Sequence, residues 1–130
     1  MTNDLSLPKV TELSNIERMI DVAREVRNKA IIALLYSSGL RVSELCRLAP
    51  QDIYLSTMQV HVRSGKNHCD HWTILSQKAA DLLVEYWKSN PRKRDYLFVS
   101  LKAPYKPLSK NGVRCMIRKI GDEAGVPHAH

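Results

Sequence analysis

The chain has 130 residues, of which 44% are hydrophobic, and its formal net charge is +7 at pH 7. This length suits one domain rather than two, and this share of apolar residues excludes a disordered chain. No apolar run reaches the roughly 20 residues that a membrane helix needs. The N-terminus MTNDLSLPKV lacks the pattern of a secretory signal, so we expect a cytoplasmic chain. Cys46, Cys69 and Cys115 are odd in number and far apart, as in a reducing compartment.

Most of the positive charge lies in the C-terminal part of the chain. Residues 1–90 hold 11 Lys and Arg against 10 Asp and Glu, whereas residues 91–130 hold 9 against 3. A basic region of this kind suits a polyanion such as nucleic acid. An ordinary solvated surface explains the same charge equally well, so charge alone does not decide between the two.

Two helical patterns open the chain. The capping box S-N-I-E begins at Ser14 and precedes an apolar stripe, which predicts a helix with Ser14 as its N-cap. Asn28 is expected to cap a second helix through AIIALLYSS (30–38). That helix is apolar on nearly every side and therefore belongs inside the core. Gly39 is expected to end it in the left-handed conformation.

A short third helix over VSELCRL (42–48) is expected to begin near Ser43, and then the period changes. MQVHVRS (58–64) and the weaker HWTILS (71–76) alternate apolar and polar residues, and GKNHCD (65–70) joins them. This pattern predicts a β-hairpin with an exposed basic tip.

Two amphipathic helices follow, each with a serine as its predicted N-cap, Ser76 and Ser109. Between them come the apolar run YLFVS (96–100) and a proline-punctuated loop, and Gly121 or Gly125 is expected to end the last helix. The apolar stripes of the two helices are Ala79, Leu82, Leu83, Tyr86 and Trp87, and Val113, Met116, Ile117 and Ile120. The sequence therefore predicts a mainly α fold with a small antiparallel β-sheet (α+β), in one domain over residues 1–130.

The stretch GLRVSELCRL (39–48) places Arg41 and Glu44 in one of the least polar neighbourhoods of the chain. A buried charge is costly unless something pairs with it. Arg41 and Glu44 are three residues apart and could pair on one helical turn as a purely structural couple. Alternatively Arg41 holds an anion, together with the basic hairpin tip at Lys66 and the basic last helix.

The last predicted helix carries Lys110, Arg114 and Arg118 at i, i+4 and i+8, opposite its apolar stripe. No acidic residue on that face neutralises them, and cations so spaced can follow phosphates or enter a major groove. A solvated face with no ligand is the alternative, and the helix pattern alone does not decide between the two.

The segment HCDH (68–71) contains metal-ligating residue types, but in a hairpin alternate side chains point to opposite faces. His68 and Asp70 would therefore diverge from Cys69 and His71, and we expect turn and strand residues with no metal and no cofactor. Motifs for phosphate loops, dinucleotide binding, serine hydrolases and zinc proteases are missing from the sequence.

Four segments together resemble the catalytic domain of tyrosine recombinases, or phage integrases, and most closely the Xer-like branch. LPKVTELSNIERMI is similar to the start of that domain, ALLYSSGLRVSELCRL to its first catalytic box, and VRSGKNHCDHWTILS to its β-hairpin. PLSKNGVRCMIRKIGDEAGV is similar to the helix before the second box. The resemblance implies that this chain is an incomplete catalytic domain.

Carried over residue by residue, the resemblance implies that Arg41 is the first catalytic arginine and Lys66 the hairpin lysine, with Glu44 bracing the arginine's region. Arg63, Lys110, Arg114 and Arg118 are then expected to contact DNA. In this family a tyrosine attacks a DNA phosphodiester and forms a 3′-phosphotyrosyl link without metal. Arginine suits such a site because its guanidinium is planar, always charged and bidentate, and a lysine can protonate the leaving 5′-oxygen.

The family's second box, H-x-x-R, and the nucleophilic tyrosine after it are not recognisable in the chain. Either His128 or His130 is the first histidine of that box, or the box lies wholly beyond residue 130. The five tyrosines all precede this point: Tyr36, Tyr54, Tyr86, Tyr96 and Tyr105. The hairpin also departs from the family, with Cys69 and His71 where further basic residues are common. We therefore expect this chain to bind double-stranded DNA but not to cleave it.

Further expectations follow from the resemblance. The parent would be a DNA recombination or integration enzyme of a bacterium or mobile element, tetrameric on DNA and associated with the nucleoid, while this chain alone would be a monomer. Two other classes stay open. One is a non-catalytic DNA-binding module or remnant on the same scaffold, and the other is a helical interaction domain whose basic end binds an acidic protein.

Overall fold

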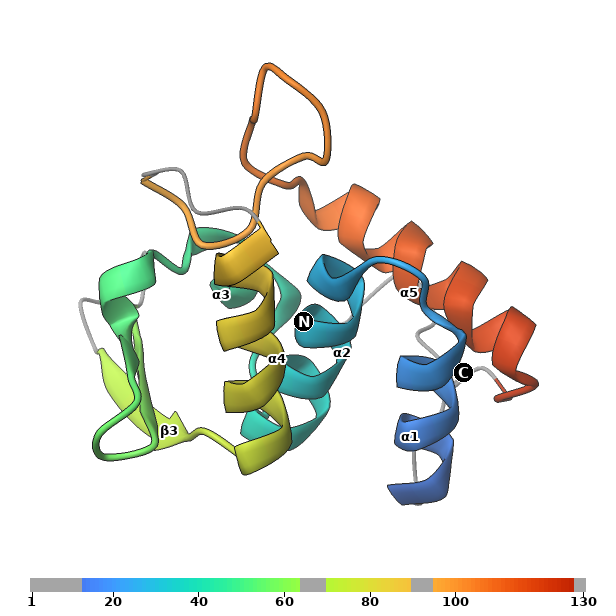
Figure 1. Ribbon diagram of the computed structural model, residues 1–130, viewed down its shortest axis with the longest axis horizontal. Helices are drawn as coiled ribbons and strands as arrows, with labels where there is room; N and C mark the ends of the chain where they lie inside the picture. The colour runs from blue at the N-terminus through green and yellow to red at the C-terminus, as the bar shows by residue number, and fades with distance from the viewer. Residues whose placement is uncertain (1–12, 64–69, 90–94, 128–130) are drawn as a thin grey trace.

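The computed structural model of the chain describes residues 13–63, 70–89 and 95–127. Its helices are α1 (Leu13–Val22), α2 (Val26–Ser38), α3 (Val42–Arg47), α4 (Gln77–Ser89) and α5 (Lys110–Ala124), with a short 3-10 turn, η1, at Pro50–Asp52. The strands β1 (Ile53–Tyr54), β2 (Gln59–Val62) and β3 (His71–Ile74) form one antiparallel sheet in that order. Figure 1 shows the sheet on one side of the helices, with α1 and α5 on the other. The predicted mainly helical fold with a small antiparallel sheet is confirmed.

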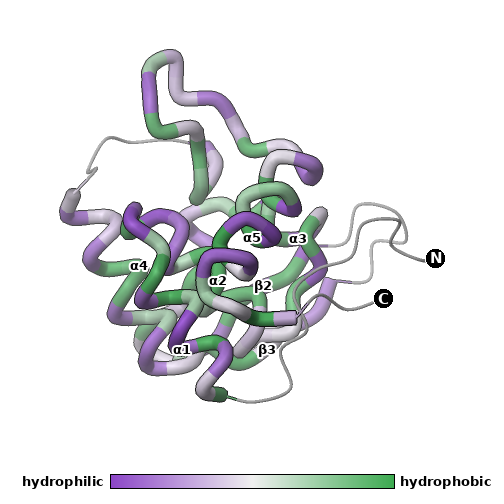
Figure 2. The backbone as a smooth tube through the Cα atoms, turned by 90° about the vertical axis from the view of Figure 1, so that its right-hand side faces the viewer, coloured by the Kyte–Doolittle hydropathy of each residue, from purple (hydrophilic) through white to green (hydrophobic). Residues whose placement is uncertain are grey.

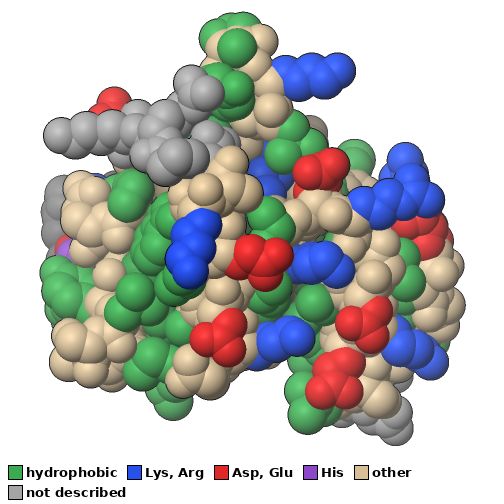
Figure 3. Space-filling view, in the orientation of Figure 1, with side chains coloured by type: hydrophobic (Ala, Val, Ile, Leu, Met, Phe, Trp, Pro, Cys, Tyr) green, Lys and Arg blue, Asp and Glu red, His purple; other side chains and the backbone are tan. Residues whose placement is uncertain are grey.

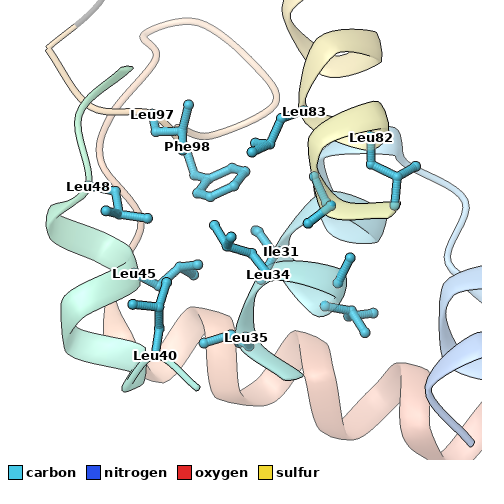
Figure 4. Close-up of a cluster of buried hydrophobic side chains, with 14 of the residues drawn as sticks. Ile31, Leu34, Leu35, Leu40, Leu45, Leu48, Leu82, Leu83, Leu97 and Phe98 are labelled. Carbon is cyan, nitrogen blue, oxygen red and sulfur yellow. The ribbon is translucent and has the colours of Figure 1, made fainter. Parts of the chain in front are cut away.

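Helix α2 lies at the centre of the core because it is apolar on nearly every side. It packs against α1 and α4, and Ile31 and Leu34 are fully buried within it. Figure 4 shows both side chains facing Phe98, with Leu83 of α4 close by. Gly39 ends the helix with φ 70°, and its N–H donates to the carbonyl of Leu35. The predicted left-handed end of this helix is therefore confirmed.

Helices α4 and α5 bury the apolar stripes that their spacing predicts, and Figure 2 shows hydrophilic and hydrophobic segments alternating around α4. The buried residues of the two stripes are Ala79, Leu82, Leu83 and Tyr86, and Val113, Ile117 and Ile120. Trp87 and Met116 are only partly buried but still pack against the core. Gly125, with φ 74°, ends α5 in the left-handed conformation.

The sheet has one buried face and one partly exposed face. Val60 and Val62 of β2 point into the core, while Trp72, the pairing partner of His61, is 50% exposed on the other face. The two predicted hairpin arms are confirmed as β2 and β3, and the predicted basic tip lies outside the described residues. Strand β1 was not predicted from the sequence because its two residues are too few to show an alternating pattern.

Two of the four predicted N-caps are confirmed. The hydroxyl of Ser76 accepts from the N–H of Ala79, and that of Ser109 accepts from the N–H of Gly112. The prediction for Ser14 is wrong, since α1 already includes Leu13.

The prediction for Asn28 as the cap of the second helix is also wrong. Helix α2 begins at Val26, and the side-chain oxygen of Asn28 accepts from the guanidinium of Arg27 instead. The third helix begins at Val42 rather than Ser43, with Arg41 in the N-cap position. None of the described helices is both long and apolar enough to cross a membrane.

The central position of α2 predicts a large cost for shortening one of its side chains. Leu34→Ala should lower the free energy of unfolding by about 2–5 kcal/mol, because it opens a cavity where neighbours cannot fully close. Leu13→Ala is the matched control, since Leu13 is 68% exposed, and it should change stability by less than about 0.5 kcal/mol. Urea denaturation measures both variants, and equal effects would contradict this assignment of the core.

Candidate functional site

Arg41 is held outward by the burial of its two neighbours. Leu40 is 8% exposed and Val42 is 6% exposed, whereas Arg41 between them is exposed. Its backbone is extended, with φ −77° and ψ 153°, directly after the left-handed turn at Gly39. Successive side chains of an extended segment point to opposite sides, so the guanidinium faces solvent when its neighbours face the core. The desolvation cost that the sequence suggested for Arg41 is therefore small.

Glu44 acts on the backbone at Arg41 rather than on its guanidinium. The Oε1 atom of Glu44 accepts from the backbone N–H of Arg41 at 2.9 Å, which caps the first turn of α3. Within the part of the chain that the structure describes, the ion pairs do not include Arg41. The structure thus favours a guanidinium free to meet a ligand over a structural Arg41–Glu44 couple.

Arg114 from α5 lies beside Arg41 at a hollow of about 310 Å³. The hollow is formed where the start of α3 meets the end of α2 and the first half of α5, and Figure 4 shows Leu35 and Leu40 lying over α5 there. The Nε atom of Arg114 is buried and has no hydrogen-bond partner among the described residues. A buried donor without a protein partner is uncommon, and Arg114 has no group among the described residues that explains its place at the hollow.

Basic side chains surround the thiol of Cys46 on α3. Burial raises the pKa of the Cys46 thiol, while Lys110, Arg114 and Arg47 act in the opposite direction. Arg47 belongs to α3, and Lys110 and Arg114 lie close to it because α5 packs against α3. Together with Arg41 they form a cationic cluster, defined as Arg41, Arg47, Lys110 and Arg114. The cluster joins residues that are up to 73 positions apart in the sequence.

Tyr36 also lines the hollow, from the last turn of α2. Burial raises the pKa of its phenol from 10.0 to about 12. At neutral pH the hydroxyl is therefore protonated and weakly nucleophilic. Tyr86 is buried in the core, where its ring stacks on Phe98 with the centroids 5.6 Å apart.

A second charged group surrounds the buried carboxylate of Asp52, which is 4% exposed. Asp52 accepts from the N–H of Ala49 at 2.9 Å and pairs with the Nη2 atom of Arg63 at 3.1 Å. The Nδ1 atom of His61 is 3.5 Å from the same carboxylate, and its Nε2 atom is 3.2 Å from Asp70. Sequence reasoning missed Asp52 and His61, although an aspartate between the apolar segments LAP and IYL was a possible signal.

Arg63 and Arg47 connect the charged residues around Asp52 to α3. The Nη2 atom of Arg63 donates to the carbonyl of Arg47 at 3.0 Å, and the Nη2 atom of Arg47 donates to the carbonyl of Arg63 at 3.3 Å. Arg63 is thus engaged with protein groups, and its predicted contact with DNA stays a prediction. The two hydrogen bonds fix the end of β2 against the end of α3, where Arg47 of the cationic cluster lies.

The remaining predicted residues lie in different places. Arg118 is one helical turn beyond Arg114 on α5 and is half-buried. Lys66, His68 and Cys69 lie outside the described residues, so the prediction for the hairpin lysine stays open. In the described segments 13–63, 70–89 and 95–127, no cluster of His, Cys, Asp and Glu could hold a metal ion.

Comparison with known proteins identifies a family for this arrangement. The sequence model of the phage integrase family matches residues 9–130. The chain is 34% identical over 127 residues to tyrosine recombinase XerA of Pyrococcus horikoshii, covering 95% of this chain and 45% of the relative. It is 33% identical over 131 residues to tyrosine recombinase XerC of Bacillus pumilus, covering 92% and 42%. The chain spans less than half the length of these curated relatives.

Solved structures agree with the sequence comparison. The crystal structure of XerA recombinase matches with a TM-score of 0.81 and 29% identity, covering 96% of this chain and 45% of that chain. Lambda integrase (residues 75–356) bound to DNA matches with a TM-score of 0.69 and 15% identity, covering 98% and 48%, which shows a shared fold. The chain therefore belongs to the phage integrase family, and its relatives within that family are Xer-like tyrosine recombinases.

Proposed function

We propose that residues 1–130 are the N-terminal portion of the catalytic domain of a site-specific tyrosine recombinase, and that they bind double-stranded DNA through the cationic cluster. One observation carries this proposal. Arg41 and Arg114 come from separate elements and line one hollow, and Arg41 takes part in none of the ion pairs of the described residues. Two guanidinium groups around one hollow suit a phosphate, because each can donate two parallel hydrogen bonds to it.

In the proposed reaction of the parent enzyme, a tyrosine attacks a DNA phosphodiester and the 5′-hydroxyl leaves. Arg41 would bind a non-bridging phosphate oxygen and stabilise the negative charge that grows in the transition state. Glu44 would keep Arg41 in place by capping its backbone N–H. Lys66 would protonate the leaving 5′-oxygen, as the resemblance implies. The 3′-phosphotyrosyl link conserves the bond energy, so that a second strand can attack and rejoin.

The proteins with the same fold support DNA as the partner. XerH site-specific recombinase has been solved bound to its difH substrate, and lambda integrase as a tetramer bound to a Holliday junction. We propose that the parent of this chain likewise assembles on DNA and acts at the nucleoid, and that this chain alone is a monomer. Integration, excision and resolution are the reactions open to the parent.

The cationic cluster predicts salt-dependent DNA binding. Replacing Lys110 and Arg114 by Gln should flatten the slope of log K against log salt concentration by roughly two units, because each phosphate contact releases about one counterion. Fluorescence anisotropy with a labelled duplex, at a series of salt concentrations, measures the slope. Replacing Arg18 on α1 and Lys78 on α4 by Gln removes the same charge elsewhere and should leave the slope unchanged. Equal slopes for both double variants would contradict the role of the cluster.

The chain alone should not form a covalent link to DNA. A nicked suicide duplex that traps 3′-phosphotyrosyl intermediates should yield no adduct in a denaturing gel, whereas full-length XerA serves as the positive control. The reason is that Tyr36, which is the tyrosine beside Arg41, is protonated and weakly nucleophilic at neutral pH. An adduct that disappears in Tyr36→Phe would overturn this part of the proposal.

The raised pKa of Tyr36 also predicts a pH dependence of stability. Above about pH 10 the unfolded chain loses the Tyr36 proton, while the folded chain keeps it up to about pH 12. The contribution of Tyr36 to the free energy of unfolding is therefore complete below about pH 10 and is lost between these values. Urea denaturation across this range should show a steeper fall for the wild type than for Tyr36→Phe, and parallel curves would contradict the burial of the phenol.

A further inference from the structure

The loop between residues 99 and 107 is closed at its base by hydrogen bonds. Val99 and Pro107 form an isolated antiparallel bridge, and the N–H of Ser100 donates to the carbonyl of Lys106 at 2.8 Å. The Ser100 hydroxyl accepts from the N–H of Lys106 at 3.0 Å, and it lies 3.0 Å from the carbonyl oxygens of Lys102 and Pro104. One side chain therefore organises the whole loop from inside.

The base of this loop is anchored in the core while its outer part is exposed. Leu97, Phe98 and Val99 are buried, and the N–H of Leu97 donates to the carbonyl of Leu48 at 2.7 Å. Residues 101–104 are exposed. Figures 1 and 2 show, from two directions, that the loop stands clear of the rest of the chain beyond the N-terminal end of α5. It is thus a fixed projection, because its ends are anchored and its interior is hydrogen-bonded.

The charged residues of the loop and of most of α5 are all basic. Residues 96–121 contain no Asp or Glu, and their cations are Lys102, Lys106, Lys110, Arg114, Arg118 and Lys119. Lys102 and Lys106 on the loop are exposed and take part in none of the ion pairs of the described residues. Figure 3 shows a basic side chain extending from the projecting loop, whereas acidic and basic side chains are interspersed over α1 and α4.

We propose that the loop 99–107 is a preorganised arm that extends the DNA interface beyond α5, with Lys102 and Lys106 on backbone phosphates. This inference rests on the proposed function, since it continues the surface of Lys110 and Arg114. Lys110 is the first residue of α5, so the loop continues the basic surface directly beyond that end of the helix. A phosphate recurs every 3.4 Å or so along each strand, which gives both lysines a partner there.

Because the loop is already ordered in the free protein, it should bind DNA more tightly than a flexible loop with the same charges. A flexible loop would have to be immobilised on DNA, and that loss of freedom weakens binding. The Ser100 hydrogen bonds fix the backbone around both lysines in the free protein. Ser100 is accordingly a positioning residue for Lys102 and Lys106.

The test compares four variants in DNA binding by anisotropy over a series of salt concentrations. Replacing Lys102 and Lys106 by Gln should weaken binding on the order of tenfold at low salt and flatten the log–log salt slope by roughly two units. The loss should be equal for two duplexes of unrelated sequence, because phosphate contacts do not read bases. Ser100→Ala keeps the charge, and it should weaken binding a few-fold with the slope preserved.

The control is the variant with Arg18 and Lys78 replaced by Gln, which removes the same charge from α1 and from the first turn of α4. Figure 1 shows that this end of α4 is far from the loop, so this variant should bind like the wild type. If the loop variant also binds like the wild type while the Lys110 and Arg114 variant is impaired, the arm is refuted and the proposed function stands. If the wild-type chain binds no duplex at any salt concentration, the proposed function fails and the arm fails with it. A loss confined to one duplex sequence would refute phosphate contact.

Discussion

The burial of Leu40 and Val42 is the constraint on which the candidate site depends. These two side chains are fixed in the core on either side of Arg41, so the extended backbone leaves the guanidinium only the outward direction. Gly39 makes this arrangement possible because its φ of 70° turns the chain at the end of α2 without the strain that a side chain would add. The catalytic arginine of the proposed reaction is therefore positioned by hydrophobic packing, and its charge remains available because no ion pair of the described residues uses it.

The residues that contact Asp52 also fix the position of the sheet relative to α3. A buried carboxylate is tolerated only with several partners, and Asp52 has the N–H of Ala49, the guanidinium of Arg63 and the imidazole of His61. Arg63 and Arg47 then exchange hydrogen bonds with each other's carbonyls. The ends of α3 and β2 are thereby held together by two hydrogen bonds. This link fixes the end of β2 relative to the helix that follows Arg41.

Patterns that depend on neighbouring residues were predictable from the sequence, and contacts between distant segments were not. The stripes of α4 and α5 follow from helical periodicity, and Ser76 and Ser109 cap their helices because a serine hydroxyl reaches a nearby N–H. Asn28 failed as a cap because α2 begins two residues earlier, at Val26, which places Asn28 inside the first turn. The residues of the first catalytic box marked Arg41 as a site residue, but nothing in the sequence brings Arg114 beside it, since that contact requires α5 to pack against α3. Lys110 and Arg114 were identified from their shared helix face alone, and their place near Cys46 emerged only from the fold.

The cationic cluster brings four like charges together where α3 meets α5. Arg41, Arg47, Lys110 and Arg114 repel one another, and a structural role would be met better by carboxylates interspersed among them. A polyanion removes the repulsion when it binds, and a ligand at 100 times its dissociation constant adds about 2.7 kcal/mol to the stability of the folded state. In the proposed function the cluster is explained by its ligand, because a phosphate backbone would neutralise these positive charges when it lies against them.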